Sequence, residues 1–84
     1  MVSPNEIADR VKAFILREFL AGEDPDELTP TTPLVTAGIL DSLGTLRLVT
    51  FLEETYDITI EAHEADADNL NTIESITRLV SAKL

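Results

Sequence analysis

The chain has 84 residues, enough for one small domain with a limited core. Sixteen acidic residues against six basic ones give a formal net charge of −10, which argues against nucleic acids and anionic membranes as partners. Cysteine is absent, which excludes disulfides, thiolate metal sites and a cysteine nucleophile, and no apolar run approaches the length of a membrane span. We expect a monomeric, cytoplasmic protein with a single domain over residues 1–84.

The first helix is predicted over residues 4–20. The segment Ser3-Pro4-Asn5-Glu6 is typical of a capping box, with a serine cap, a proline at the first helical position and a glutamate that can reach back. Gly22 supplies a stop signal. Apolar residues recur between these signals at helical spacing, namely Ile7, Val11, Phe14, Ile15 and Phe19.

Residues 21–40 are predicted to form a loop that is unusually long for a compact domain, because they hold three of the four prolines and lack sustained periodicity. A long loop that delivers residues to one place is often functional. Its apolar residues could fasten it against the helices; they are Leu28, Leu34, Val35, Ile39 and Leu40.

A second helix is predicted to begin at a cap formed by Asp41 or Ser42 and to end near Tyr56. It carries two apolar stripes. The first comprises Thr45, Leu48, Val49, Leu52 and Tyr56. The second comprises Leu43, Leu46 and Thr50. A small bundle buries one stripe readily, so the second is either additional core or a contact face.

Residues 57–60 alternate for too short a stretch to build a sheet, and residues 61–71 are acidic, with one short helical turn expected over 62–67. Asn71 or Thr72 is predicted to cap a last helix that reaches Lys83. The predicted fold is therefore all-α: a four-helix bundle of three main helices plus a short one, with a long loop between the first two. The predicted core comprises Ile7, Val11, Phe14, Leu48, Leu52, Ile76 and Val80.

Neither a metal site nor an enzyme active site is predicted. The segment Asp66-Ala67-Asp68 begins like a calcium loop, but the later glycine and glutamate of that loop are missing. His63 is the only histidine and has no partner at ligand spacing. A Ser–His–acid triad is formally possible, but no oxyanion-hole signature accompanies it.

The acidic residues are unevenly placed, since residues 21–41 and 61–71 together hold nine acids and no base. Such runs are either ordinary solvated surface or a face that meets basic partners, and both interpretations remain open.

The segment 36–44, Thr-Ala-Gly-Ile-Leu-Asp-Ser-Leu-Gly, carries the most specific chemistry. It sets the hydroxyl of Ser42 at a helix N-terminus, beside the carboxylate of Asp41 and next to apolar side chains. A helix N-terminus stabilises a phosphate group, so a phosphodiester on Ser42 would be favoured there. Spacing alone favours the simpler interpretation that both residues merely cap the helix.

The same segment resembles the acyl and peptidyl carrier proteins, through G-I-L-D-S-L followed by an amphipathic helix that ends in L-E-E. The resemblance extends along almost the whole chain, with T-x-x-T-P-L before the motif, Y-D-I-T-I after it and N-L-N-T-I-E-S-I at the last helix. It implies a four-helix bundle in which 4′-phosphopantetheine from coenzyme A is esterified to Ser42. The thiol of that arm would carry an acyl group as a thioester, which is compatible with a chain that lacks cysteine.

Two details separate this chain from fatty-acid-type carriers, which usually have one residue fewer between the glycine and the aspartate and acids just after the motif. Here two residues separate Gly38 from Asp41, and Gly44 and Arg47 follow the motif. The pattern is more similar to discrete aminoacyl or peptidyl carriers, including those of D-alanine transfer and nonribosomal pathways. We therefore expect a stand-alone, non-catalytic carrier for aminoacyl- or peptidyl-type secondary metabolism. The alternatives are a fatty-acid- or polyketide-type acyl carrier and, from another class, an acidic interaction or inhibitor protein.

The resemblance also implies partners: a phosphopantetheinyl transferase, an acyl- or aminoacyl-adenylating ligase, and condensing or tailoring enzymes. In this scheme Asp41 orients the transferase. The expected docking surface consists of the stripe Leu43, Leu46 and Thr50, flanked by Arg47, Glu53 and Glu54, which tune the choice of partner.

Overall fold

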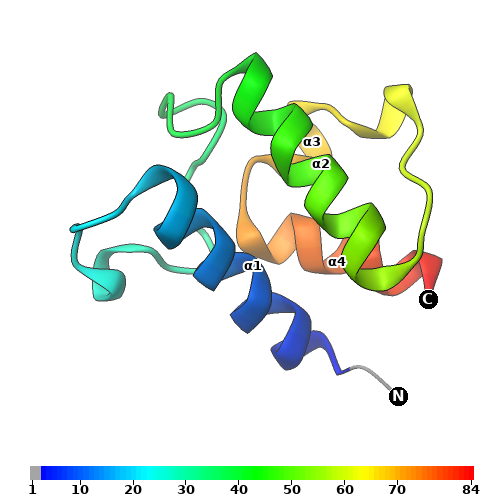
Figure 1. Ribbon diagram of the computed structural model, residues 1–84, viewed down its shortest axis with the longest axis horizontal. Helices are drawn as coiled ribbons and strands as arrows, with labels where there is room; N and C mark the ends of the chain where they lie inside the picture. The colour runs from blue at the N-terminus through cyan, green and yellow to red at the C-terminus, as the bar shows by residue number, and fades with distance from the viewer. Residues whose placement is uncertain (1–2) are drawn as a thin grey trace.

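A computed structural model describes residues 3–84, and within that range the chain forms helices and turns without a strand (Figure 1). The elements are α1 (Pro4–Phe19), η1 (Pro25–Glu27), α2 (Ser42–Tyr56), η2 (Ala62–Glu64), α3 (Ala67–Leu70) and α4 (Ile73–Lys83), η denoting a 3₁₀ turn. The predicted all-α bundle of three main helices and a short one is confirmed.

The first helix begins as predicted, because the Ser3 hydroxyl accepts a hydrogen bond from the Glu6 amide at 3.2 Å and Pro4 opens the helix. Glu6 lies 3.9 Å from Arg10 in an i,i+4 pair, in place of the expected return bond to the cap. The helix ends at Phe19, one residue before the predicted end, and Gly22 follows with φ of +89°.

The segment after residue 60 contains one element more than predicted. The expected turn over 62–67 is correct only in part, since η2 ends at Glu64 and the separate helix α3 begins at Ala67. Asp66 caps α3 by accepting from the Asn69 amide at 3.0 Å. Four residues are too few to give a periodic pattern, and for that reason the sequence did not separate the two elements.

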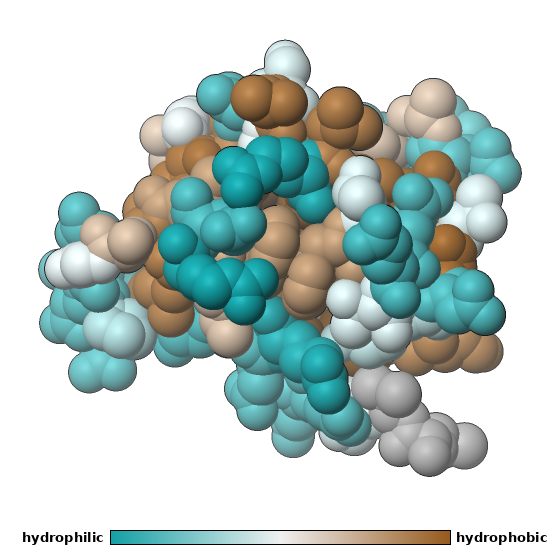
Figure 2. All heavy atoms as spheres, viewed as in Figure 1, coloured by the Kyte–Doolittle hydropathy of each residue, from teal (hydrophilic) through white to brown (hydrophobic). Residues whose placement is uncertain are grey.

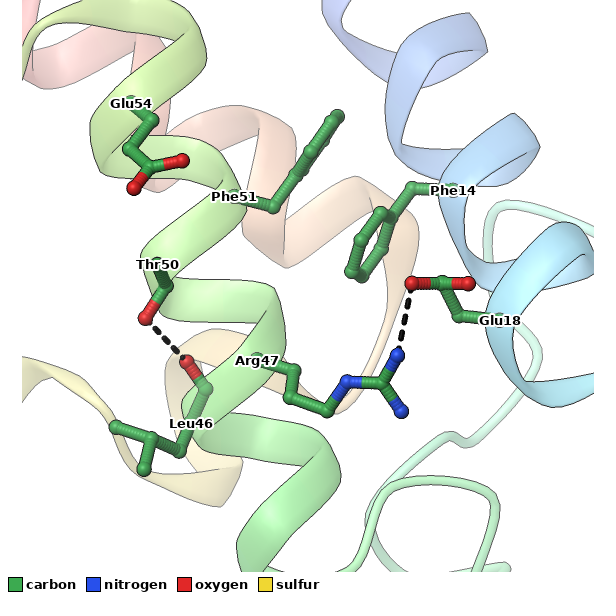
Figure 3. Close-up of a pocket in the computed structure, with 7 residues that line it drawn as sticks. All are labelled: Phe14, Glu18, Leu46, Arg47, Thr50, Phe51 and Glu54. Atoms are coloured by element: carbon green, nitrogen blue, oxygen red, sulfur yellow. Dashed lines mark hydrogen bonds and ion pairs between the residues drawn. The ribbon is translucent and has the colours of Figure 1, made fainter.

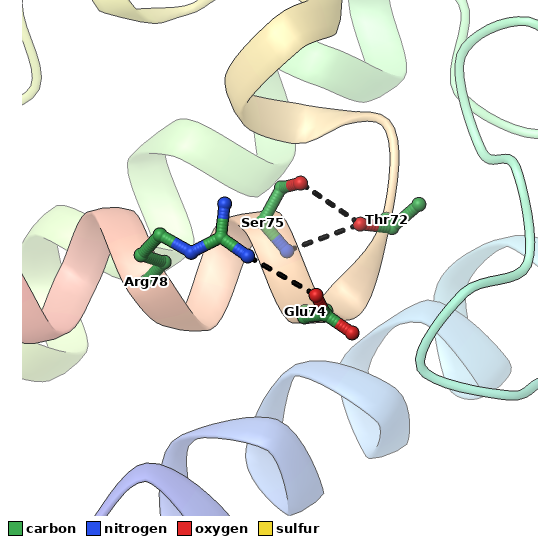
Figure 4. Close-up of polar contacts among 4 residues, drawn as sticks. All are labelled: Thr72, Glu74, Ser75 and Arg78. Atoms are coloured by element: carbon green, nitrogen blue, oxygen red, sulfur yellow. Dashed lines mark hydrogen bonds and ion pairs between the residues drawn. The ribbon is translucent and has the colours of Figure 1, made fainter.

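The last helix is capped by Thr72 rather than by Asn71. The hydroxyl oxygen of Thr72 accepts a hydrogen bond from the Ser75 amide at 3.0 Å, and on the exposed face Arg78 pairs with Glu74 at 3.1 Å (Figure 4). Asn71 is left free to bond elsewhere.

The core lies where α1 packs against α4, with α2 beside α1 and crossing in front of α4 in the view of Figure 1. All seven predicted core residues are buried. Between α1 and α2 the rings of Phe14 and Phe51 stack with centroids 4.2 Å apart. The long loop is fastened to this core by the buried side chains of Leu28, Leu34 and Leu40, each of which stabilises the fold by roughly 1.5–3 kcal/mol.

Candidate functional site

Ser42 lies at the exposed start of α2, where the long loop ends. The cap of α2 is formed by Asp41, whose carboxylate accepts a hydrogen bond from the Gly44 amide at 2.6 Å. The hydroxyl of Ser42 therefore takes no part in the cap. Of the two sequence-based alternatives for the cap, the structure selects Asp41.

Two open depressions meet at Ser42, between α2 and the segment that returns through η2. One has a volume of about 550 Å³ and is lined by Val35, Leu40, Asp41, Ser42, Thr45 and Ala65. The other has a volume of about 440 Å³ and is lined by Ser42, Thr45, Leu46, Val49, Glu53, Ile60, Ala62 and Ala65. An exposed hydroxyl at the edge of an open, partly apolar surface fits the attachment of a long flexible arm. The N-terminus of α2 would stabilise the phosphate of such an arm.

A family model described as the phosphopantetheine attachment site matches residues 15–80, which is most of the chain and includes the start of α2. The chain belongs to this family. Its cofactor is accordingly a covalently attached 4′-phosphopantetheine. Carrier proteins of this kind work together with phosphopantetheinyl transferases and with ligases.

The chain is similar to D-alanyl carrier proteins of streptococci. It is 45% identical to that of Streptococcus mutans serotype c over 53 residues, which cover 58% of this chain and 67% of the relative. It is 42% identical to that of Streptococcus pyogenes serotype M1 over 45 residues, which cover 54% of this chain and 57% of the relative. The chain thus spans between about half and two thirds of the length of the curated relatives it matches.

In this carrier the second apolar stripe of α2 is not additional core. Leu43 and Leu46 are 65% and 61% exposed, and Thr50 is exposed beside them. The space-filling view shows apolar surface over the first turns of α2, at the top (Figure 2). The structure places the stripe next to Ser42; its use for docking stays a prediction.

Arg47 reaches across to α1 rather than standing free on the surface of the carrier. Its guanidinium pairs with the Glu18 carboxylate at 2.8 Å (Figure 3). It also lies 5.6 Å from the centre of the Phe19 ring. The pair lies at the edge of a depression of about 390 Å³, lined by Phe14, Glu18, Leu46, Arg47, Thr50, Phe51 and Glu54. Nothing near Arg47 in the sequence indicates Glu18 as its partner, because 29 positions separate the two residues.

The two glutamates expected beside the docking stripe have different surroundings. Glu54 is exposed at the edge of the depression between α1 and α2 (Figure 3). Glu53 lies on the opposite side, where its carboxylate accepts a hydrogen bond from the Ile60 amide at 2.8 Å. Glu53 therefore holds the returning chain against α2, and a partner-docking role for either residue stays a prediction.

Residues 3–84 contain no group of three or more His, Cys, Asp or Glu side chains that could hold a metal ion, and His63 is exposed. Within the same residues no helix is both long enough and apolar enough to span a membrane.

Proposed function

We propose that this chain is a stand-alone aminoacyl carrier that holds its cargo as a thioester on 4′-phosphopantetheine attached to Ser42. The observation that supports this most directly is the position of Ser42: exposed on the first turn of α2, outside the cap, at the meeting point of two open depressions. When bound, the arm supplies the thiol that carries the cargo.

The residues around Ser42 have distinct tasks in this proposal. The Ser42 hydroxyl would give up its proton to the transferase and become the ester oxygen, while the pyrophosphate bond of coenzyme A breaks and adenosine 3′,5′-bisphosphate leaves. Asp41 holds the first turn of α2 through its bond to the Gly44 amide, and the unpaired amides of that turn stabilise the negative phosphate. Leu43, Leu46 and Thr50 offer the enzymes an apolar surface beside the attachment point.

Two observations favour an aminoacyl cargo over a fatty acyl chain. The relatives reported above are D-alanyl carriers. The exposed face of α2 after the motif carries Arg47, at a place where fatty-acid-type carriers usually have acids. The narrower assignment to secondary metabolism stays a prediction.

Attachment is tested by the intact mass after incubation with coenzyme A, magnesium and a promiscuous phosphopantetheinyl transferase. We expect a gain of one phosphopantetheine in the wild type and none in Ser42→Ala. Ser81→Ala, which removes an exposed hydroxyl from α4, is the matched control and is expected to gain the full mass. Absence of the gain on folded wild-type protein would refute the proposal.

The cargo is tested on the modified protein. D-alanine, ATP and a D-alanine-activating ligase are expected to add one alanyl group that hydroxylamine removes, as it does from a thioester. Efficient loading by a fatty-acyl ligase together with no loading by aminoacyl ligases would contradict the aminoacyl assignment and favour the acyl-carrier alternative.

A further inference from the structure

Asn71 lies between α3 and α4, yet its side chain bonds to the long loop that ends at Ser42. The side-chain oxygen accepts from three consecutive backbone amides, those of Leu34 at 3.2 Å, Val35 at 2.9 Å and Thr36 at 3.0 Å. The Thr36 hydroxyl is 3.4 Å from the same oxygen, and the Leu34 amide also donates to the Asn71 backbone carbonyl at 2.6 Å. One side chain thus satisfies the amides of a whole turn of the loop.

The turn bonded to Asn71 also has backbone hydrogen bonds within itself. The Leu40 amide donates to the Leu34 carbonyl at 3.0 Å, and the Gly38 amide donates to the Val35 carbonyl at 3.1 Å. Gly38 has φ of +80°, a conformation that side-chain-bearing residues rarely adopt. Because Leu34 and Leu40 are both buried, residues 34–40 form a compact unit that the chain leaves directly into the cap of α2.

The same turn forms one side of the attachment site. Val35 and Leu40 line the larger depression together with Ser42. The amide of Val35 is one of those bonded to Asn71, so the position of this wall depends on that acceptor. Without the side-chain oxygen, the amides of Val35 and Thr36 would lose this acceptor, and the Val35 amide is partly buried, whereas the Leu34 amide would keep its bond to the Asn71 backbone carbonyl. The turn could then satisfy the Val35 amide only by moving towards water.

We propose that Asn71 is a positioning residue for the attachment of 4′-phosphopantetheine: it fixes the turn 34–40 so that Ser42 and the depression beside it are presented to the transferase in one geometry. This inference rests on the proposed function, in which Ser42 is the attachment point. It assigns to Asn71 a task that its neighbours along the chain do not share, since Thr72 caps α4 and Asn69 bonds to the Glu64 carbonyl at 3.0 Å.

The test compares three variants as substrates of a phosphopantetheinyl transferase at saturating coenzyme A. Asn71→Leu keeps a similar volume and removes the acceptor, Asn71→Asp keeps the acceptor oxygen, and Thr72→Ala removes the cap of α4 without touching the turn (Figure 4). We expect Asn71→Leu to lower kcat/KM about tenfold, chiefly through KM, because a turn that is no longer fixed leaves only a fraction of the protein in the geometry that the transferase binds. Asn71→Asp and Thr72→Ala are expected to stay within about twofold of the wild type.

Three results would overturn the inference. The first is an unchanged kcat/KM in Asn71→Leu, and the second is a kcat/KM in Asn71→Asp as low as in Asn71→Leu. The third is an equal loss of kcat/KM in Thr72→Ala when this variant and Asn71→Leu have the same melting temperature. If the wild type itself is not modified at Ser42, the proposed function fails instead. Should Asn71→Leu not fold, amide hydrogen exchange decides. The amides of Val35 and Thr36, whose acceptor is the Asn71 side chain, are expected to be protected in the wild type and in Asn71→Asp, and rapid exchange in the wild type would refute the role of Asn71.

Discussion

The guanidinium of Arg47 extends from α2 to α1, where it pairs with Glu18 and lies over the ring of Phe19. The Arg47 side chain is 48% exposed and that of Glu18 29%, so the pair contributes no more than about 1 kcal/mol to stability. A partner that approaches this side of α2 therefore meets an ion pair and not an isolated positive charge.

Reversal of the Arg47 charge tests whether this residue selects partner enzymes or only stabilises the fold. We expect Arg47→Glu to lower kcat/KM for aminoacylation by more than about twofold, equivalent to ~0.4 kcal/mol, and to raise it for fatty-acid-type enzymes. It also places two carboxylates together, so the free energy of unfolding should fall by up to about 1 kcal/mol. The double swap Glu18→Arg with Arg47→Glu is expected to restore stability but not aminoacylation.

A control for this prediction is Arg78→Glu, which reverses the more exposed cation of an ion pair on α4, away from Ser42. It should leave aminoacylation unchanged. If kcat/KM of Arg47→Glu stays within about twofold for both enzyme classes, Arg47 does not select partners.

Tyr56 has a buried hydroxyl that pairs with no group in residues 3–84, and burial raises the pKa of that hydroxyl. A buried polar group without a partner destabilises the folded state. We expect Tyr56→Phe to leave the free energy of unfolding unchanged or to increase it by up to about 1 kcal/mol, as measured by urea denaturation. A loss of more than about 1 kcal/mol would show that the hydroxyl has a partner.

The residues of the attachment site differ in how far the sequence reveals them. Ser42 and Asp41 were identified because the motif is local: cap, hydroxyl and apolar neighbours follow one another directly. For Asn71 the sequence indicates only a possible cap of the last helix, because the amides that donate to its side chain lie 35–37 positions away. The pairing of Glu18 with Arg47 escaped prediction for the same reason.

Among the elements, the helix ends that carry a local signal were predicted best. The serine–proline start of α1 and the extent of α2 and α4 follow from caps and apolar spacing. The division of residues 61–71 into η2 and α3 was not predicted, because it depends on how this segment is pinned between α2 and α4. Glu53 holds one end through the Ile60 amide, and Lys83 holds Glu64 at 2.8 Å.

The clamp between η2 and α4 makes stability depend on pH. Glu64 accepts from Lys83 and from the Glu61 amide, and these bonds hold the pKa of its carboxyl below the ordinary value of 4.5. A lowered pKa in the folded state stabilises the protein above the ordinary value, and this contribution is lost as the pH falls through the folded value.

We therefore expect the melting temperature of Glu64→Gln to fall less than that of the wild type when the pH is lowered from about 6 to about 3. Differential scanning calorimetry at both values measures this difference. Glu23→Gln, which neutralises an exposed acid before η1, is the matched control and is expected to keep the wild-type acid sensitivity. Equal sensitivity in all three proteins would show that the clamp does not contribute.

Across the whole molecule, the two acidic segments do not form one face. The segment around η1 lies at the left of the bundle and the segment around η2 at the right, along a molecule whose longest extent is 31 Å (Figure 1). At ordinary salt, charges are screened within about 8–10 Å, so repulsion acts mainly within each segment. The alternative of an inhibitor that mimics a polyanion thereby loses the continuous acidic surface it would need.

At low salt the screening length grows to about 30 Å, so the two segments then repel each other across the molecule. We expect the melting temperature to rise by several degrees between about 10 mM and about 150 mM sodium chloride. The double variant Glu23→Gln with Asp26→Asn should show a smaller rise. A melting temperature independent of salt would mean that the acids are paired individually.

Because of the bonds between Asn71 and the turn 34–40, the site around Ser42 can form only after residue 71 has been synthesised. Their donors precede the acceptor by 35–37 residues, so a ribosome releases the serine-bearing segment well before the residue that secures it. An unfinished or unfolded chain already contains Ser42 but not its bonded surroundings. A transferase that requires those surroundings would modify only chains in which residue 71 has been made and the turn 34–40 is bonded, so the attached arm would mark chains that have folded around Ser42.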